Sequence, residues 1–69
     1  MAVFTSPMAG KVLSINVKPG DTFHDGDVVV ILESMKMEIP VFMEGEGVVA
    51  EILTAVGASV SEGAELLRY

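Results

Sequence analysis

The sequence contains no cysteine and no tryptophan. Without cysteine the chain has no disulfide, no thiol nucleophile and no thiolate metal site. The single histidine, His24, lacks evident partners for a metal site, so we expect it to be a surface side chain and expect no metal. These absences exclude thiol catalysis and are consistent with a reducing compartment.

Basic residues and long apolar runs are also scarce. Four Lys and Arg residues stand against ten Asp and Glu residues, which gives a net charge of −6. Nucleic acids and anionic membranes bind through clustered basic side chains, so neither is an expected partner. The longest apolar run, residues 28–32, is far shorter than the ~20 residues of a membrane-spanning helix. The first residues also lack the pattern of a secretory signal peptide. We therefore expect a cytoplasmic protein.

What the sequence does contain is an internal repeat. A shift of 37 residues superposes the second half on the first without a gap. The matched pairs include Gly10 and Gly47, Val12 and Val49, Ile15 and Ile52, Gly20 and Gly57, and Gly26 and Gly63. Two copies are too few for a solenoid, so the repeat predicts one domain, residues 1–69, with a pseudo-twofold axis.

Each copy has the pattern of short strands separated by glycine-centred turns. Residues 13–17 alternate between apolar and polar, as in a half-buried strand, and residues 18–21, Lys-Pro-Gly-Asp, match a type II turn. Residues 28–32 are apolar on both pleat faces, which predicts a strand covered on both sides. Further strands are expected at residues 2–5, 38–42, 48–53, 59–60 and 65–68. No segment has helical periodicity, so the chain is expected to be a small all-β sandwich or flattened barrel.

Three residues interrupt these strand patterns. Val12 is out of phase with the alternation that follows it, and Val49 is out of phase at the matching place in the second copy. The shared irregularity predicts a bulge or sharp twist at both places. Pro40 has no N–H group to donate to a ladder, so its strand is expected to lie at a sheet edge or to pair irregularly there.

The stretch 33–38, Glu-Ser-Met-Lys-Met-Glu, lies between two predicted strands and must contain a turn. It has none of the Gly, Asn or Asp residues that normally close a hairpin. Instead Met35 and Met37 flank Lys36, and such a break of a local rule tends to mark function. Because this hairpin joins the two copies, we expect Lys36 at an exposed tip, with the chain termini away from it.

An isolated surface lysine usually has no special role, but this position favours one. A lysine that acts as a Schiff-base nucleophile needs a desolvating pocket, which a lysine at a hairpin tip of so small a chain does not readily obtain. Lys36 fits better as the substrate of another enzyme. A lysine amine is protonated at neutral pH, so that enzyme must remove the proton and bring an activated acyl group. We therefore expect no catalytic residues in this chain.

Residues 33–38 resemble the biotin-attachment motif of biotinyl domains, usually Ala-Met-Lys-Met. The resemblance extends over the whole chain: residues 6–12, Ser-Pro-Met-Ala-Gly-Lys-Val, are similar to the family's opening segment, and residues 19–21 and 26–27 to its turns. It is closest to small single-domain biotin/lipoyl attachment proteins, which share the Glu-Ser-Met-Lys-Met-Glu-Ile-Pro of residues 33–40. The resemblance implies a barrel-sandwich hybrid, a flattened barrel of two four-stranded antiparallel sheets.

The same resemblance implies a non-catalytic carrier in a biotin-dependent carboxylase or decarboxylase system. Biotin protein ligase would attach biotin covalently to Lys36 from biotinyl-adenylate. The swinging arm would then carry carboxylate from a biotin carboxylase to a carboxyltransferase. Met35 and Met37 would position the lysine for the ligase. Glu33 and Glu38 are either solvated strand ends or docking contacts for the ligase.

The sequence departs from the family pattern in three ways. Ser34 replaces the commoner Ala, a change between small residues that we expect to be tolerated. The gapless repeat leaves no room for the protruding thumb that some bacterial carboxyl carriers insert in their first half. The sequence also has no long N-terminal region or Ala/Pro linker, so we expect either a free-standing small protein or an excised domain.

Two other interpretations remain. Lipoyl domains share the fold and the hairpin lysine, so lipoate on Lys36 is the alternative cofactor. Lipoyl domains typically carry Asp-Lys-Ala at the tip, and the flanking Met35 and Met37 therefore favour biotin. The third interpretation is an unmodified β module that acts through protein contacts alone.

Overall fold

The computed structural model describes residues 2–69, so Met1, the first residue of the predicted domain, lies outside the described residues. This part of the chain forms β-strands and no helix, and it measures 31 × 19 × 17 Å. It therefore contains no helix that could span a membrane. The strands are β1 (Val3–Thr5), β2 (Gly10–Ile15), β3 (Thr22–Phe23), β4 (Val28–Ser34), β5 (Met37–Phe42), β6 (Gly47–Val48), β7 (Glu51–Ile52), β8 (Ser59–Val60) and β9 (Glu65–Arg68).

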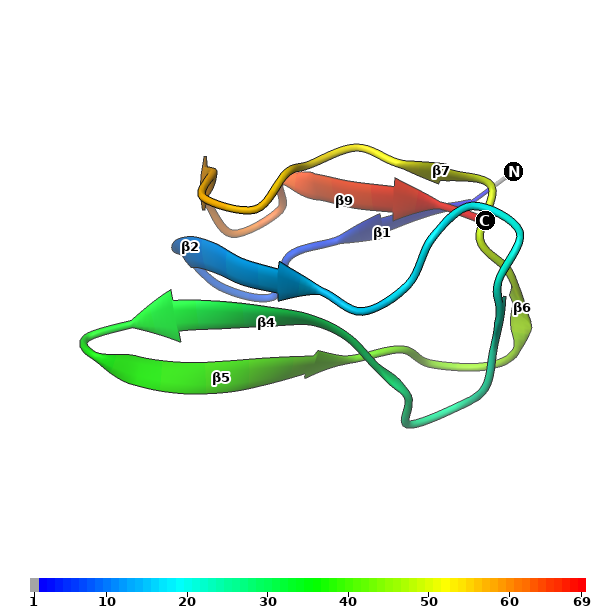
Figure 1. The fold of residues 1–69 in the computed structure, drawn as a ribbon, viewed down its shortest axis with the longest axis horizontal. Helices are drawn as coiled ribbons and strands as arrows, with labels where there is room; N and C mark the ends of the chain where they lie inside the picture. Colours follow the sequence, from blue (N-terminus) through cyan, green and yellow to red (C-terminus); the bar gives the residue numbers. More distant parts are fainter. Residues whose placement is uncertain (1) are drawn as a thin grey trace.

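The strands form two layers, as Figure 1 shows. One layer is a four-stranded antiparallel sheet in the order β5-β4-β2-β8. The other consists of a three-stranded sheet, β1-β9-β7, and the pair β3-β6. When 37 is subtracted from their residue numbers, β6 and β7 fall on the two ends of β2, and they are therefore its counterparts in the second copy. The second layer is thus the counterpart of the first, broken between β6 and β7, and the all-β barrel-sandwich prediction is confirmed.

The break corrects one prediction, because residues 48–53 do not form a single strand. Val49 leaves the sheet and bonds to the first copy's turn: its N–H donates to the Asp21 carbonyl at 2.8 Å, and its carbonyl accepts from the Gly20 N–H at 2.8 Å. The irregularity predicted at Val49 is therefore a change of partner. At Val12 it is a bulge, because the register between β2 and β4 shifts between Val12 and Ser14.

Val12, the counterpart of Val49, makes the equivalent pair of hydrogen bonds to the turn of the second copy. The Val12 carbonyl accepts from the Gly57 N–H at 2.8 Å, and the Val12 N–H donates to the Ala58 carbonyl at 2.9 Å. Each copy's turn is thus tied to the other copy's strand. These reciprocal bonds obey the 37-residue shift and place the two halves about the predicted pseudo-twofold axis.

Bulges also explain the apolar run in β4. The register between β4 and β5 shifts between Val28 and Val30, and both Val29 and Val30 are buried in the core. Val28 and Ile31 are only half-buried. The prediction that this strand is covered on both sides is therefore wrong, because the bulge turns two consecutive residues toward one core. The second copy repeats the arrangement in β9, where the register with β1 skips Leu66 and both Leu66 and Leu67 are buried.

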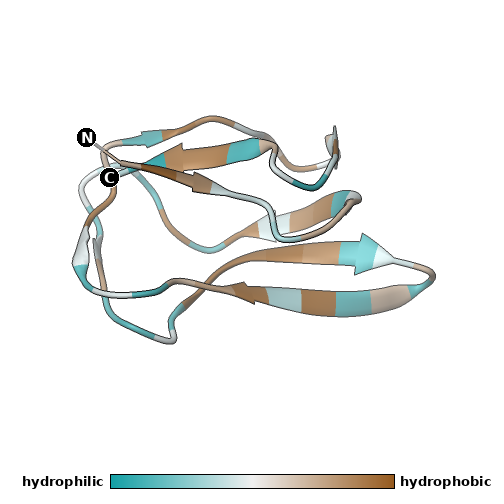
Figure 2. Ribbon diagram, turned by 180° about the vertical axis from the view of Figure 1, so that it is seen from behind, coloured by the Kyte–Doolittle hydropathy of each residue, from teal (hydrophilic) through white to brown (hydrophobic). Residues whose placement is uncertain are grey.

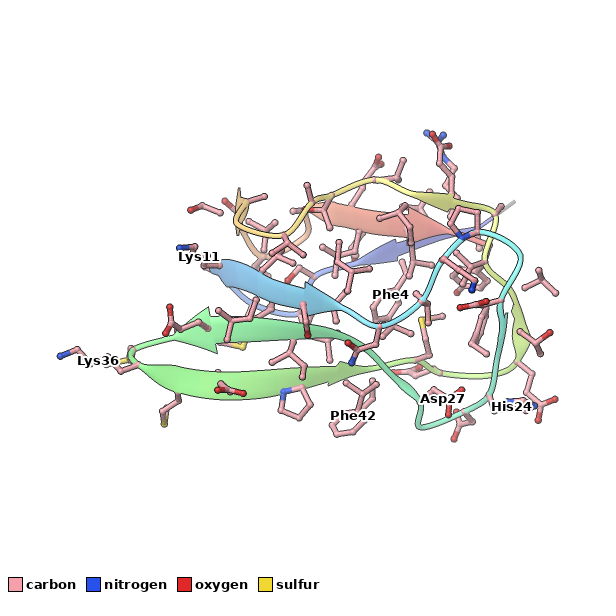
Figure 3. All side chains as sticks on the ribbon, in the orientation of Figure 1. Phe4, Lys11, His24, Asp27, Lys36 and Phe42 are labelled. Carbon is pink, nitrogen blue, oxygen red and sulfur yellow. The ribbon has the colours of Figure 1, made fainter. Side chains whose placement is uncertain are left out.

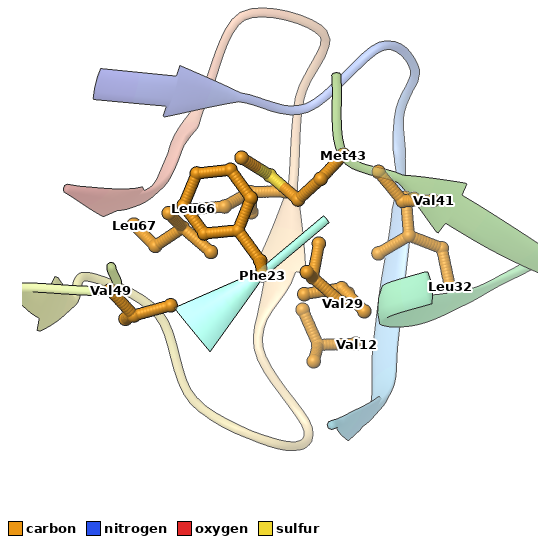
Figure 4. Close-up of a cluster of buried hydrophobic side chains, with 10 residues drawn as sticks. Val12, Phe23, Val29, Leu32, Val41, Met43, Val49, Leu66 and Leu67 are labelled. Carbon is orange, nitrogen blue, oxygen red and sulfur yellow. The ribbon is translucent and has the colours of Figure 1, made fainter. Parts of the chain in front are cut away.

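Phe23 is the largest buried side chain and lies among aliphatic residues from both copies (Figure 4). Its ring meets that of Tyr69 edge to face, with centroids 5.1 Å apart and an interplanar angle of 86°. Hydrophobic residues run along the strands of both layers, whereas the connections are mostly hydrophilic (Figure 2). Apolar burial between the layers is therefore the main stabilising contribution.

The predicted turns and edges are mostly confirmed. Gly20 has φ +95°, and the Asp21 N–H donates to the Lys18 carbonyl at 3.0 Å, as in a type II turn. Gly57 occupies the same conformation in the second copy, with φ +91°. Pro40 lies in β5, an edge strand, where a missing N–H leaves no gap in the ladder.

Gly47 packs directly against the core, which gives a stability prediction. A Cβ at Gly47 would lie 2.8 Å from Cζ and 3.1 Å from Cε2 of Phe23, whose ring is fully buried. We expect Gly47→Ala to lower the free energy of unfolding by about 1–3 kcal/mol through overpacking, as measured by urea denaturation. In a Phe23→Leu background the added cost should shrink, because the ring that clashes is gone. An equal cost in both backgrounds would contradict this explanation.

Candidate functional site: a lysine on a strained hairpin

The hairpin between β4 and β5 closes with only two residues in its turn. Ser34 pairs with Met37, and Glu33 pairs with Glu38, so Met35 and Lys36 form the turn. Their φ angles are +53° and +65°. Positive φ at both central positions is the signature of a type I′ turn, whose twist matches that of the flanking strands. The expected hairpin turn is therefore present at Lys36.

Backbone preference alone does not explain these two residues. The left-handed conformation costs a residue with a Cβ atom about 1 kcal/mol or more, and type I′ turns accordingly favour Asn-Gly. The described non-glycine residues have positive φ nowhere except at Met35 and Lys36. Strain confined to one place in a fold is characteristic of a functional position.

The side chains at the tip of the hairpin are exposed to solvent. Lys36 is exposed, and Met35 and Met37 are 89% and 58% exposed. Within residues 2–69, no hydrogen bond or ion pair reaches the Lys36 side chain, which Figure 3 shows extending from the end of the hairpin. A groove of about 540 Å³ lies elsewhere, between β1 and β5, and its lining includes Phe4, Phe42 and Tyr69. The geometry therefore suits an amine that reacts inside another protein.

Charged residues form a row across the four-stranded sheet beside the tip. Lys11 pairs with Glu33, which pairs on its other side with Glu38. All three side chains are exposed, and side chains at paired positions lie on one face of a sheet. Two glutamates directly opposite one another repel, so this row is not an arrangement that maximises stability. Sequence reasoning identified Glu33 and Glu38 but missed Lys11, whose position depends on the register between β2 and β4.

The polar pair His24 and Asp27 lies at the opposite end of the molecule from Lys36 (Figure 3). His24 and Asp27 are exposed and lie at the β3–β4 turn, with 3.7 Å between Nδ1 and Oδ2. Residues 2–69 contain no group of three His, Asp or Glu side chains that could hold a metal ion. His24 is a surface side chain, as predicted.

Comparison with known proteins identifies the family. The family model Biotin_lipoyl, described as "Biotin-requiring enzyme", matches residues 2–68. The chain belongs to this family. It is 47% identical over 61 residues to the biotin/lipoyl attachment protein of Bacillus subtilis, and the match covers 88% of this chain and 84% of that protein. It is 38% identical over 61 residues to the biotin carboxyl carrier protein of acetyl-CoA carboxylase from Solanum lycopersicum, with 88% and 87% covered.

Two solved structures agree with this assignment. A single-chain, multi-domain long-chain acyl-CoA carboxylase superposes with a TM-score of 0.88 at 26% identity, over 96% of this chain and 6% of that one. The lipoyl domain of the 2-oxoglutarate dehydrogenase complex from Azotobacter vinelandii superposes with a TM-score of 0.77 at 27% identity, over 100% and 98%. The chain therefore shares its fold with part of an acyl-CoA carboxylase and with a lipoyl domain.

The strain at the turn leads to a prediction. Asn tolerates the left-handed conformation better than Met does, so Met35→Asn should raise the free energy of unfolding by about 0.5–1 kcal/mol, measured in urea. Met37→Asn is the matched control. Met37 begins β5 and does not have positive φ, so Asn at that position should bring no gain, because strands disfavour it. Equal effects of the two substitutions would contradict the strain argument.

Proposed function

We propose that residues 1–69 work as one biotinyl-attachment domain, a carboxyl carrier whose Lys36 receives biotin from a biotin protein ligase. The observation that carries the proposal is the two-residue turn, which holds an unpaired, exposed lysine between two exposed methionines at the end of a rigid hairpin. The family membership and the carrier relatives support the same assignment.

The residues at the tip fit a covalently attached group. An amide bond to Lys36 Nζ needs an amine that no neighbour covers and that can enter the active site of a ligase, and the exposed position of Lys36 at the end of the hairpin supports this assignment. The attached biotin would supply the carboxyl-carrying ring, moved between a biotin carboxylase and a carboxyltransferase. This chain's contribution is mechanical: β4 and β5 pair along their length and anchor the hairpin through buried Leu32 and Val41. A tethered group reaches local concentrations in the mM range for a short flexible link.

Each neighbour of Lys36 has a separate proposed task. Met35 and Met37 offer apolar contacts on either side of the amine, so they would seat it in a complementary pocket of the ligase. Glu33 and Glu38 lie one step further from the tip on adjacent strands, where they would dock against basic groups of the ligase. Of these four residues, the two methionines support a role in ligase recognition better, because exposed apolar side chains make no contribution to the core.

Lipoate on the same Lys36 is the second candidate, favoured by the superposition on a lipoyl domain. The two candidates differ in which enzyme accepts the tip. Replacing the flanks by Met35→Asp and Met37→Ala should slow biotinylation and increase lipoylation, because it copies the Asp-Lys-Ala tip typical of lipoyl domains.

Intact mass after incubation with biotin protein ligase, biotin and ATP tests the attachment. We expect the chain to gain the mass of one biotinyl group and Lys36→Arg to gain none, because arginine offers no acylable amine. Lys11→Arg and Lys18→Arg are matched controls at other exposed lysines and should gain the full increment. A lipoyl increment with a lipoate ligase and none with the biotin ligase would support the alternative. If the chain gains mass with neither ligase, the result would support an unmodified β module.

Charge reversal tests the docking role of the glutamates. The double variant Glu33→Lys and Glu38→Lys should reduce the rate of biotinylation about tenfold at low salt, since electrostatic steering changes association rates by 10-fold or more. Glu44→Lys with Glu46→Lys makes the same change of net charge in the β5–β6 loop, at the end away from the tip (Figure 1), and should have little effect. Equal losses in the two double variants would show that net charge matters and local docking does not.

A further inference from the structure

The four methionines in the described part of the chain divide into two classes. Met43 is 2% exposed, and Met8 is half-buried and packs against the core. Met35 and Met37 are 89% and 58% exposed and lie on either side of Lys36. The chain has no cysteine, so within residues 2–69 these two thioethers are the most accessible sulfur atoms.

Thioethers react with peroxides in a balanced two-electron step. The sulfur attacks one peroxide oxygen, the O–O bond breaks, a sulfoxide S–O bond forms, and the second oxygen leaves as water after taking up a proton. The sulfur is oxidised and the peroxide is reduced. The product is polar where methionine was apolar, and sulfoxide reductases reverse it. A peroxide must reach the sulfur atom to react with it, and the exposed fractions separate Met35 and Met37 from Met43 by a wide margin.

We propose that Met35 and Met37 form a reversible oxidation site that controls whether Lys36 is accepted by its modifying enzyme. The inference rests on the proposed function of Lys36. Sulfoxides at these positions would put polar groups where a partner pocket expects apolar side chains, so the amine would no longer be seated. The fold would not change, because neither side chain belongs to the buried core and the turn is held by the pairing of Ser34 with Met37 through the backbone.

Oxidation and loading can be measured separately. The unmodified protein is treated with increasing hydrogen peroxide, and peptide mass spectrometry locates the sulfoxides. We expect Met35 and Met37 to oxidise before Met8 and Met43, with circular dichroism unchanged. The oxidised protein is then incubated with biotin protein ligase, and intact mass follows the biotin increment. We expect a rate about tenfold lower than that of the untreated protein, the loss typical of a mismatched apolar group in a pocket. Treatment with methionine sulfoxide reductases should restore it.

Variants show which sulfur atoms are responsible. In Met35→Leu with Met37→Leu the tip cannot be oxidised, so the ratio of treated to untreated rates should stay near one, whatever the basal rate of that variant. Met8→Leu is the matched control and should keep the sensitivity of the wild type. Sulfoxides that form at Met8 or Met43 as early as at the tip would overturn the proposal, as would an oxidised tip that is biotinylated at the untreated rate. If the untreated protein gains no biotin, the proposed function fails, and the order of oxidation is still measured.

Discussion

Two pairs of backbone hydrogen bonds tie a turn of each half to a strand of the other half, and they add to the pairing of β2 with β8 and of β3 with β6 across the two halves. Gly20 and Asp21 bond to Val49, and Gly57 and Ala58 bond to Val12. Each half thereby supplies the turn that holds the other half's strand. Neither copy can bury its apolar face alone, because Phe23 and Val29 of the first copy share one core with Leu66 and Leu67 of the second. The halves are therefore stable only as a pair.

This pairing also explains why the lysine and the chain termini lie at opposite ends. Under the 37-residue shift, Leu32 and Ile39 at the base of the hairpin correspond to Tyr69 and Ala2. Ala2 and Tyr69 bond to one another through both backbone groups, at 2.7 and 2.9 Å, as Leu32 and Ile39 pair within the hairpin. The pair of β4 and β5 continues into the tip that bears Lys36, whereas the equivalent pair of β9 and β1 leads to the chain termini. A chain attached at either terminus would therefore leave the molecule far from the tip (Figure 1).

The sequence predicted the parts of this structure that local chemistry determines. Glycines at matching positions identified the repeat, Pro19 and Gly20 determined a turn, and the absence of turn residues around Lys36 marked the exceptional hairpin. An irregularity was predicted at Val49, but the break of the strand there was not, because its cause is a hydrogen-bonding partner 28 residues away in sequence, at Asp21. For the same reason the row of Lys11, Glu33 and Glu38 needed the register between strands. Interactions between copies, unlike turns within a copy, leave no local pattern.

The strain at Met35 and Lys36 is substantial on the scale of so small a domain. A chain of this length has a total stability of about 3–10 kcal/mol, and two left-handed residues cost about 1 kcal/mol each. An Asn-Gly turn would avoid most of that cost, but it would remove the amine and its apolar neighbour. The longest strands of the fold, β2, β4 and β5, form the base of the strained turn, so its cost is offset by the pairing and burial directly beneath it. The strain is thus confined to the two exposed residues of the tip, while the strands beneath it carry buried side chains such as Leu32 and Val41.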